Sequence, residues 1–434
     1  MADIEKPGAD LARAAAARPE THSGRRRFLA RSAAFTAGVV GAAGAKRTLA
    51  AAPPTDLPSW SKAPGTPMRS YGTPSRFEEP VKRVVAGGYP KISPGTGSSL
   101  TPLQALEGAI TPSGLHFERH HSGVPDIDPL HHHLVVHGLV RRPLKFALDT
   151  LSRYPLVTRT CFIECAGNSA RNTGPEPVQV TCGTIHGLLS TSEWTGVRVA
   201  LLLEEAGIDP AAKWVLADGA DSAAMSRSIP LDKILDDAMI GLYQNGERLR
   251  PEQGYPMRLL LPGWEGNMNV KWLRQLKLVD APHHTKDETS KYADLMPDGK
   301  SRQFTFVLVV KSVITHPSFG MTMTGRGMYE ISGLAWSGAG RIARVDVSTD
   351  GGQTWNAARL QTPVLSKSAT RFRMPWNWHG EPALLQSRAV DEKGNVQPGR
   401  NTWTALYSPG NRYHNNAIQT WSVQADGSIA NVYA

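Results

Sequence analysis

The strongest constraint on the fold is a change of hydrophobic pattern about two thirds of the way along the chain. From Leu103 to Thr285, short apolar segments of strand character alternate with helical stretches, as at 197–206 and 231–238. From Phe304 onward, apolar and polar residues alternate one by one, which is the period of a strand with one buried face. The sequence therefore predicts an α+β domain followed by an antiparallel β-sandwich.

Turn residues support the sandwich. Asp350-Gly351-Gly352 and Lys393-Gly394-Asn395 are typical hairpin turns. Two segments show the alternation most clearly: Ala343, Val345 and Val347 alternate with Arg344, Asp346 and Ser348, and Phe372 and Met374 alternate with Arg371 and Arg373.

The N-terminal segment indicates the compartment. Three arginines at 25–27 precede Phe28-Leu29, an uncharged Gly/Ala-rich run at 33–45, and small residues at 50–52 before a double proline. This pattern is typical of a twin-arginine export signal, and the 13-residue run is shorter than the roughly 20 residues that a membrane span needs. We expect a signal at 1–52, an extended arm at 53–100, domains at 101–300 and 301–434, no membrane span, and a periplasmic protein.

The net charge does not indicate nucleic-acid binding. The whole chain carries +10, but residues 1–52 contain nine Lys/Arg and four Asp/Glu, so half of that charge lies in the expected signal. A net charge of +5 on the remaining residues does not indicate a nucleic-acid-binding surface, because such a surface needs basic residues clustered on one face. It fits an acidic partner or an anionic substrate equally well.

The three cysteines do not form a disulfide framework. Cys161 and Cys165 lie on a β-rich segment, where four residues separate them by about 13 Å. A disulfide needs Cα atoms within about 7 Å, so both should stay unpaired. We expect Cys182 to be a small buried hydrophobic residue.

The segment Glu164–Asn168 could carry chemistry. Cys165 ends an apolar strand and is followed by Ala-Gly-Asn, and these small residues let a bulky ligand approach the backbone. Spacing alone leaves open whether this cysteine is functional or a buried structural thiol.

An ordered set of motifs resembles the sulfite oxidase family. Cys165-Ala166-Gly167-Asn168 is similar to the family's molybdenum-ligand motif. Four further segments agree in order along the chain: 117–121 with Val124-Pro125, 245–247, 254–263 leading to Val270-Lys271-Trp272, and 347–355. The last of these resembles the family's immunoglobulin-like dimerisation domain. The resemblance covers about residues 100 to 430.

The resemblance implies a fold, a cofactor and a site. The fold would be a mixed α/β molybdopterin domain followed by an immunoglobulin-like sandwich, and Cys165 would be the molybdenum ligand. Thiolate is a suitable soft ligand, and the permanent charge of Arg119 would attract an anionic oxo-sulfur substrate. Tyr292 would be an active-site tyrosine. The implied contacts to the molybdopterin are Phe117, His120, His121, Arg258, Asn269, Val270 and Lys271, of which Arg258 and Lys271 would bind its phosphate.

Departures from the family pattern bear on substrate and partner. Gln253 replaces a histidine that is common in sulfite oxidases, and Asn267-Met268-Asn269 replaces a run containing arginine. Fewer cations favour a less highly charged substrate. No Cys-x-x-Cys-His motif for haem attachment occurs, so the electrons would leave through a separate c-type cytochrome.

Within the family, these features are most similar to the molybdenum subunits of sulfane dehydrogenases. That similarity implies a sulfane sulfur carried on a cysteine of a carrier protein as the substrate, in thiosulfate oxidation. It also implies homo-oligomeric or hetero-oligomeric association through the sandwich.

Three alternatives stay open. A direct periplasmic sulfite dehydrogenase has the same cofactor. A zinc hydrolase is suggested by His131-His132-His133 with His120, His121 and His137, although no His-Glu-x-x-His helix is present. A non-catalytic module that recruits partners through its sandwich would bind neither metal.

Overall fold

The computed structural model describes residues 57–86 and 94–434. The chain divides into two compact units, Met1–Thr73 and Pro74–Ala434. The expected export signal at 1–52 lies outside the described residues. The described part of the first unit contains one short 3-10 helix, η1 (Ser59–Ser61), and all the elements discussed below belong to the second unit.

A small antiparallel sheet precedes the main domain. Its strands are β1 (Val84–Ala86), β2 (Gly97–Leu100) and β3 (Glu118–His120), in the order β1-β2-β3. Strand β2 lies within the segment expected to be an extended arm. Strand β3 carries two of the expected site residues, Arg119 and His120.

The α+β domain expected at 101–300 contains two five-stranded sheets. One has the order β11-β10-β7-β6, with β12 pairing β10, and the other has the order β5-β4-β13-β8-β9. The strands are β4 (His133–Gly138), β5 (Leu144–Ala147), β6 (Leu156–Glu164), β7 (Leu189–Arg198), β8 (Trp214–Gly219), β9 (Ser226–Pro230), β10 (Met239–Gln244), β11 (Glu247–Arg248), β12 (Arg258–Leu260) and β13 (Leu273–Val279). Only β4 and β13 pair in parallel, so the sheets are essentially antiparallel.

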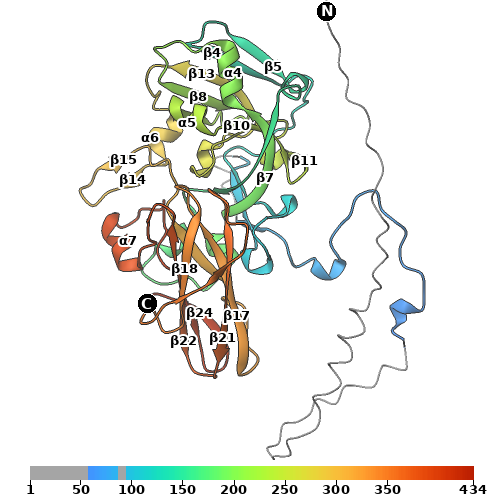
Figure 1. Ribbon diagram of the computed structural model, residues 1–434, viewed down its shortest axis with the longest axis vertical. Coiled ribbons are helices and arrows are strands. Elements are labelled where there is room, and N and C mark those ends of the chain that lie inside the picture. Colours follow the sequence, from blue (N-terminus) through green and yellow to red (C-terminus); the bar gives the residue numbers. More distant parts are fainter. Residues whose placement is uncertain (1–56, 87–93) are drawn as a thin grey trace, which may run out of the picture. The chain divides into compact units, whose positions relative to one another are not determined.

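Short helices connect these strands. They are α2 (Leu148–Leu151), α3 (Cys182–His186), α4 (Val199–Ala206), α5 (Leu231–Asp236) and α6 (Lys286–Ser290). The two helical stretches expected from the sequence are confirmed as α4 and α5. Both pack against the sheet that contains β4 and β8 (Figure 1). Their apolar residues, such as Leu202, Leu203 and Ile234, belong to one buried core with that sheet.

The C-terminal region is a β-sandwich, as expected. Its sheets have the orders β16-β17-β21-β20 and β19-β18-β22-β23-β24, and the long strands β17, β18, β21 and β22 stand out in Figure 1. The strands are β16 (Lys311–His316), β17 (Gly327–Trp336), β18 (Ile342–Ser348), β19 (Asn356–Ala357), β20 (Arg359–Leu360), β21 (Thr370–Trp378), β22 (Ala383–Asp391), β23 (Thr420–Val423) and β24 (Ile429–Val432); helix α7 is Arg400–Leu406. The small hairpin β14 (Asp294–Leu295) and β15 (Ser301–Arg302) links the two domains.

Four residues depart from the simple alternation in the sandwich: Ala343, Asp346, Ser348 and Arg371. Asp346 and Ser348 are polar and yet buried, where Asp346 pairs with Arg344 and Arg388 and the Ser348 hydroxyl donates to Asp350. Ala343 is exposed and Ile342 is buried, because a bulge between Ile342 and Arg344 shifts the register of β18 against β22. Arg371 alternates with core residues, yet it is buried. Its guanidinium donates to the carbonyls of Leu106 and Gly108 and to the Thr315 hydroxyl. The alternation of apolar and polar residues could not predict these acceptors, because they lie far from Arg371 in the sequence.

The hydrophobic core of the sandwich includes residues of the preceding α+β domain. Phe162 on β6, Cys182 and Ile185 on α3, and Leu189 on β7 join the same buried cluster as Trp336 and Trp421. The strand that leads to Cys165 is therefore supported from both domains.

Cys161 and Cys165 are free and Cys182 is buried, as the sequence predicted; Cys161 is buried as well, and Cys182 is also free. None of the helices in the described ranges is long and apolar enough to cross a membrane.

Candidate cofactor and active site

One pocket collects every residue that the sequence analysis proposed for the site. Its empty space amounts to about 680 Å³, part of which is open to solvent. Its walls come from β3, the start of the loop after β6, β12, the segment 266–272 and residue 292. The lining includes Phe117, Arg119, His120, His121, Cys165, Arg258, Asn269, Val270, Lys271 and Tyr292. The structure brings these ten residues together, while their individual roles stay predictions.

At one end of the pocket lies the thiol of Cys165, directly after β6. The Cys165 amide donates to Leu188 O (3.0 Å), and Asn168 N donates to Cys165 O (2.8 Å), so the loop is fixed at the strand end. A Cβ on Gly266 would lie 2.9 Å from Glu164 O, so only glycine lets the segment 266–269 approach so closely. Burial raises the pKa of the Cys165 thiol, and a metal ion is the natural agent to hold it as thiolate.

Arg258 and Lys271 form a second, cationic part of the lining, which we call the cationic end. Arg258 donates to Gln253 O and Asn269 O (both 3.0 Å), and its Nε has no hydrogen-bond partner among the described residues. Lys271 Nζ donates to Glu252 O (3.1 Å) and lies 2.8 Å from His120 Nδ1. Burial and the nearby Arg258 hold the pKa of Lys271 well below its usual value, and burial lowers the pKa of Arg258 to about 9. Two desolvated cations side by side favour an anionic ligand.

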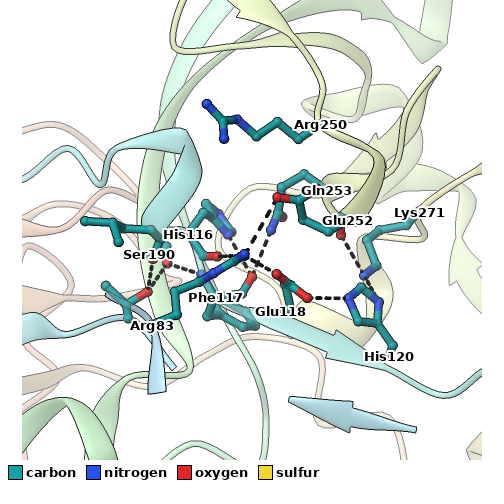
Figure 2. Close-up of polar contacts among 12 residues, drawn as sticks. Arg83, His116, Phe117, Glu118, His120, Ser190, Arg250, Glu252, Gln253 and Lys271 are labelled. Atoms are coloured by element: carbon teal, nitrogen blue, oxygen red, sulfur yellow. Dashed lines mark hydrogen bonds and ion pairs between the residues drawn. The ribbon is translucent and has the colours of Figure 1, made fainter. Parts of the chain in front are cut away.

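A polar network holds this cationic end in place, and Figure 2 shows how its side chains converge. His120 bridges Lys271 and Glu118, with Nε2 2.9 Å from Glu118 Oε2. Glu118 also forms an ion pair with Arg83, which donates to His116 O (3.2 Å). Arg83 and Glu118 were missed by the sequence analysis, because their contribution depends on the pairing of β3 with distant loops.

Arg119 and Tyr292 lie on the Cys165 side of the pocket. Arg119 donates to the carbonyls of Gly97 and His120 and keeps further donors for a ligand. The Tyr292 hydroxyl lies 2.9 Å from His121 Nε2, and the guanidinium of Arg227 stacks 5.2 Å from the Tyr292 ring. Burial raises the pKa of Tyr292, so its hydroxyl is a neutral hydrogen-bonding group.

Known proteins match both domains. Residues 121–286 match the family model described as the oxidoreductase molybdopterin binding domain, and residues 302–421 match the Mo-co oxidoreductase dimerisation domain. A chain of the crystal structure of the sulfane dehydrogenase SoxCD from Paracoccus pantotrophus is 46% identical. That match has a TM-score of 0.85 and covers 88% of this chain and 98% of the other. The chain belongs to the sulfite oxidase family of molybdopterin oxidoreductases.

More distant relatives include human mitochondrial sulfite oxidase, 32% identical over 68% of this chain and 59% of that protein. NADH nitrate reductase of Ulva prolifera is 30% identical over 69% of this chain and 39% of that protein. The chain therefore spans 59% and 39% of the length of these two curated relatives, less than two thirds in both cases.

The donor set of the pocket fits the family's molybdopterin cofactor. Cys165 offers a sulfur ligand at one end, and the unpartnered Arg258 Nε and the Lys271 amine offer donors for a phosphate at the other. Between them, Asp221 Oδ1 and Asn267 Oδ1 are buried acceptors without a hydrogen-bond partner in the described ranges. Donors and acceptors left unpaired in a buried pocket are costly unless a polar ligand binds there.

Five pocket residues of this family member were missed by the sequence analysis: His116, Ile163, Asp221, Met225 and Gly266. Trp272 had been named only within the motif 270–272, and Asn267 only within a departure from the family pattern. Asp221 follows the end of β8, so a search for polar residues at strand ends could have found it. Gln253 had been noted only as a departure from the family pattern. The structure gives it a part in the pocket wall, where its amide donates to Phe117 O (3.0 Å).

The histidine-rich segment does not form a zinc site. His131 pairs with Asp128, whereas His132 bonds to Leu273 O (2.8 Å). In the described part of the chain, no three His, Cys, Asp or Glu side chains are grouped as metal ligands. The family assignment replaces the zinc hydrolase alternative.

Proposed function

We propose that this chain is the molybdenum subunit of a sulfane dehydrogenase. It oxidises a sulfane sulfur carried on a cysteine of a carrier protein in thiosulfate oxidation and passes the electrons to a c-type cytochrome partner. The observation that carries the proposal is the 46% identity to a chain of a sulfane dehydrogenase across 98% of that chain. The similarity to sulfite oxidase is weaker and extends over only part of that protein.

The pocket residues have different roles in this proposal. When bound, the molybdenum cofactor supplies a metal that accepts two electrons as oxygen is transferred to sulfur. Cys165 anchors the metal through its sulfur, and Arg258 and Lys271 bind the cofactor phosphate. Arg119 orients the anionic sulfur group of the substrate beside Cys165, and Tyr292 donates or accepts a hydrogen bond at the same place.

The distribution of charge supports a carrier-bound substrate. Among the lining residues, Arg258 and Lys271 lie at the phosphate end, which leaves Arg119 as the permanent cation near Cys165. The positions where sulfite oxidases carry a further histidine and arginine hold Gln253 and 267–269. A free sulfite dianion gains most from several cations, whereas a sulfur covalently held by a carrier needs less charge because the carrier supplies binding energy.

The same proposal covers compartment and assembly. The arginine-rich segment at 25–29 and the small residues at 50–52 support export in the folded state to the periplasm. The matched dimerisation domain supports association through the sandwich, with a second copy, with the cytochrome subunit, or with both.

The decisive experiment compares substrates on the cofactor-loaded protein together with its haem partner. Cytochrome c reduction is followed with free sulfite and with a thiosulfate-loaded carrier protein. We expect rapid reduction only with the loaded carrier. Rapid reduction by sulfite alone would establish the second candidate, a direct sulfite dehydrogenase, and would overturn the sulfane proposal.

A further inference from the structure

A buried triad of charged side chains lies outside the motifs that define the pocket. His414 is placed between two carboxyl groups, with Nδ1 2.9 Å from Asp294 Oδ1 and Nε2 2.9 Å from Glu265 Oε1. The exposed fraction of each of the three side chains is 1% or less. Both ring nitrogens therefore face an acceptor, which is the arrangement of a doubly protonated imidazolium.

The charge state follows from these contacts. Burial opposes the charged form, but the hydrogen bonds to Asp294 and Glu265 outweigh it and raise the pKa of His414 to about 9. Asp294 also accepts from Arg302 (3.2 Å) and Thr305 (2.8 Å), so its charge is compensated from a second side. A buried ion group with this many partners fixes geometry, because removing one partner leaves a charge unpaired.

Each of the two carboxylate residues that contact His414 lies within two positions of a pocket residue in the sequence. Glu265 precedes Gly266, and it accepts from Asn267 Nδ2 (2.6 Å) and, through its carbonyl, from Asn269 Nδ2 (2.9 Å). Asp294 follows Tyr292 by two positions on the segment that begins β14.

The backbone of His414 makes the third connection. Its amide donates to Ala166 O (2.9 Å), directly beside Cys165. On its other side, its carbonyl accepts from the indole of Trp403 in α7 (3.0 Å). His414 therefore joins the cysteine loop, the 265–269 segment and the tyrosine segment to the C-terminal region.

We propose that His414 is a positioning residue for the cofactor pocket, which holds Cys165, the 266–269 segment and Tyr292 in register by bridging Glu265 and Asp294. His414 itself is not among the residues that line the pocket, so it would act through its neighbours. The C-terminal region thereby completes the metal site, in addition to its part in the sandwich core.

The test replaces His414 by glutamine, which is neutral and cannot serve both carboxylates in the same way. We expect cofactor release from the loaded protein to be about 10-fold faster, the size typical of outer-shell partners of metal ligands. Released pterin is followed by fluorescence. We also expect a shifted electron paramagnetic resonance signal of the metal after chemical one-electron reduction. Neither measurement uses a sulfur compound. The sulfane dehydrogenase proposal can therefore fail while this inference stands, and this inference can fail while the sulfane dehydrogenase proposal stands.

The matched control is His132→Gln. His132 is also buried, but its ring bonds only to the backbone carbonyl of Leu273 and lies outside the pocket lining. This variant should lose thermal stability while keeping the release rate and the resonance signal of the wild type.

Two results would overturn the inference. One is a His414→Gln protein that loses thermal stability but keeps a wild-type release rate and resonance signal, because its role would then be purely structural. If His414→Gln does not fold, the same two measurements are made on Glu265→Gln. This substitution keeps a hydrogen-bond acceptor for His414 and removes one of the two negative charges. A wild-type release rate and signal in Glu265→Gln would overturn the inference equally.

Discussion

The two ends of the pocket are built in opposite ways. The cationic end gathers Arg258 and Lys271 without a carboxylate in direct contact, and their bonds go to backbone carbonyls and to His120. The thiol end is surrounded by compensated charges: Glu164 pairs with Lys311 at 3.6 Å, and His414 bridges Glu265 and Asp294.

The difference shows which end the protein completes by itself. At the thiol end Glu164, Glu265 and Asp294 already have charged partners before any ligand binds, and Arg119 keeps donors for the substrate. At the cationic end two desolvated cations remain without a counter-charge, so binding of an anion supplies the missing interaction. Stability and cofactor binding should therefore respond differently to changes at the two ends.

The largest effect is expected at Cys165. In Cys165→Ser the softer sulfur ligand is lost, and we expect turnover to fall by about 100-fold or more, beyond the range typical for outer-shell residues. Molybdenum content by elemental analysis and steady-state turnover are measured together, with Cys182→Ser as the control because that thiol is buried away from the pocket. A Cys165→Ser protein with normal molybdenum content and turnover would show that the ligand assignment is wrong.

The next effect concerns the buried ion pair behind Cys165. Lys311 and Glu164 are both under 10% exposed, and Glu164 also accepts from Trp336 Nε1 (2.7 Å). Lys311→Met should lower the free energy of unfolding by about 3–5 kcal/mol, because it leaves the carboxylate buried and unpaired.

Addition of Glu164→Gln to Lys311→Met should recover part of that loss. Denaturant unfolding of the two single variants and the double variant measures the coupling. Additive losses would mean that the pair does not act as a unit.

A pH dependence should distinguish the two ends. The pKa of His414 rises from 6.5 to about 9, which corresponds to about 3 kcal/mol. This stabilisation is complete below about pH 6.5 and is lost as the pH rises through 9. At the cationic end, burial lowers the pKa of His116 to about 3, so its contribution is present above pH 6.5 and is lost as the pH falls below it.

Thermal unfolding midpoints across this pH range test the assignment. The gap between wild type and His414→Gln should narrow between pH 6.5 and 9.5, since the wild type loses the charge that the variant lacks. A gap that stays constant would mean that His414 is not protonated in the folded protein. His132→Gln serves again as the control.

The smallest expected effect is at Lys271. Charge-assisted hydrogen bonds contribute about 1.5–3 kcal/mol, so Lys271→Met should weaken cofactor retention about 10-fold to 100-fold. The variant should lose more thermal stability in the loaded form than in the cofactor-free form, because the acceptors of the amine are uncharged in the cofactor-free form and the bound anion adds a charged one. Equal losses in both forms would show that Lys271 is a structural residue and would remove the contrast between the two ends.

The sequence indicated much of the site because family motifs are local. The strand-end Cys165 and the Val270-Lys271-Trp272 tripeptide are read directly along the chain, and all ten proposed residues line one pocket. The periodicity also separated an α+β domain from a sandwich. The periodicity was less accurate in predicting which residues of a strand are buried. The bulge in β18 and the burial of Arg371 depend on partners far away in the sequence.

What the sequence determined by itself was the fold class and the identity of ten pocket residues, since hydrophobic period and motif order are properties of neighbouring residues. What only the tertiary structure decided was how those residues are held. Arg83, Lys311 and His414 belong to none of the sequence motifs, and their contacts join segments separated by up to about 250 positions. A buried charge acquires its role from the groups that surround it, and only the folded chain brings those groups together.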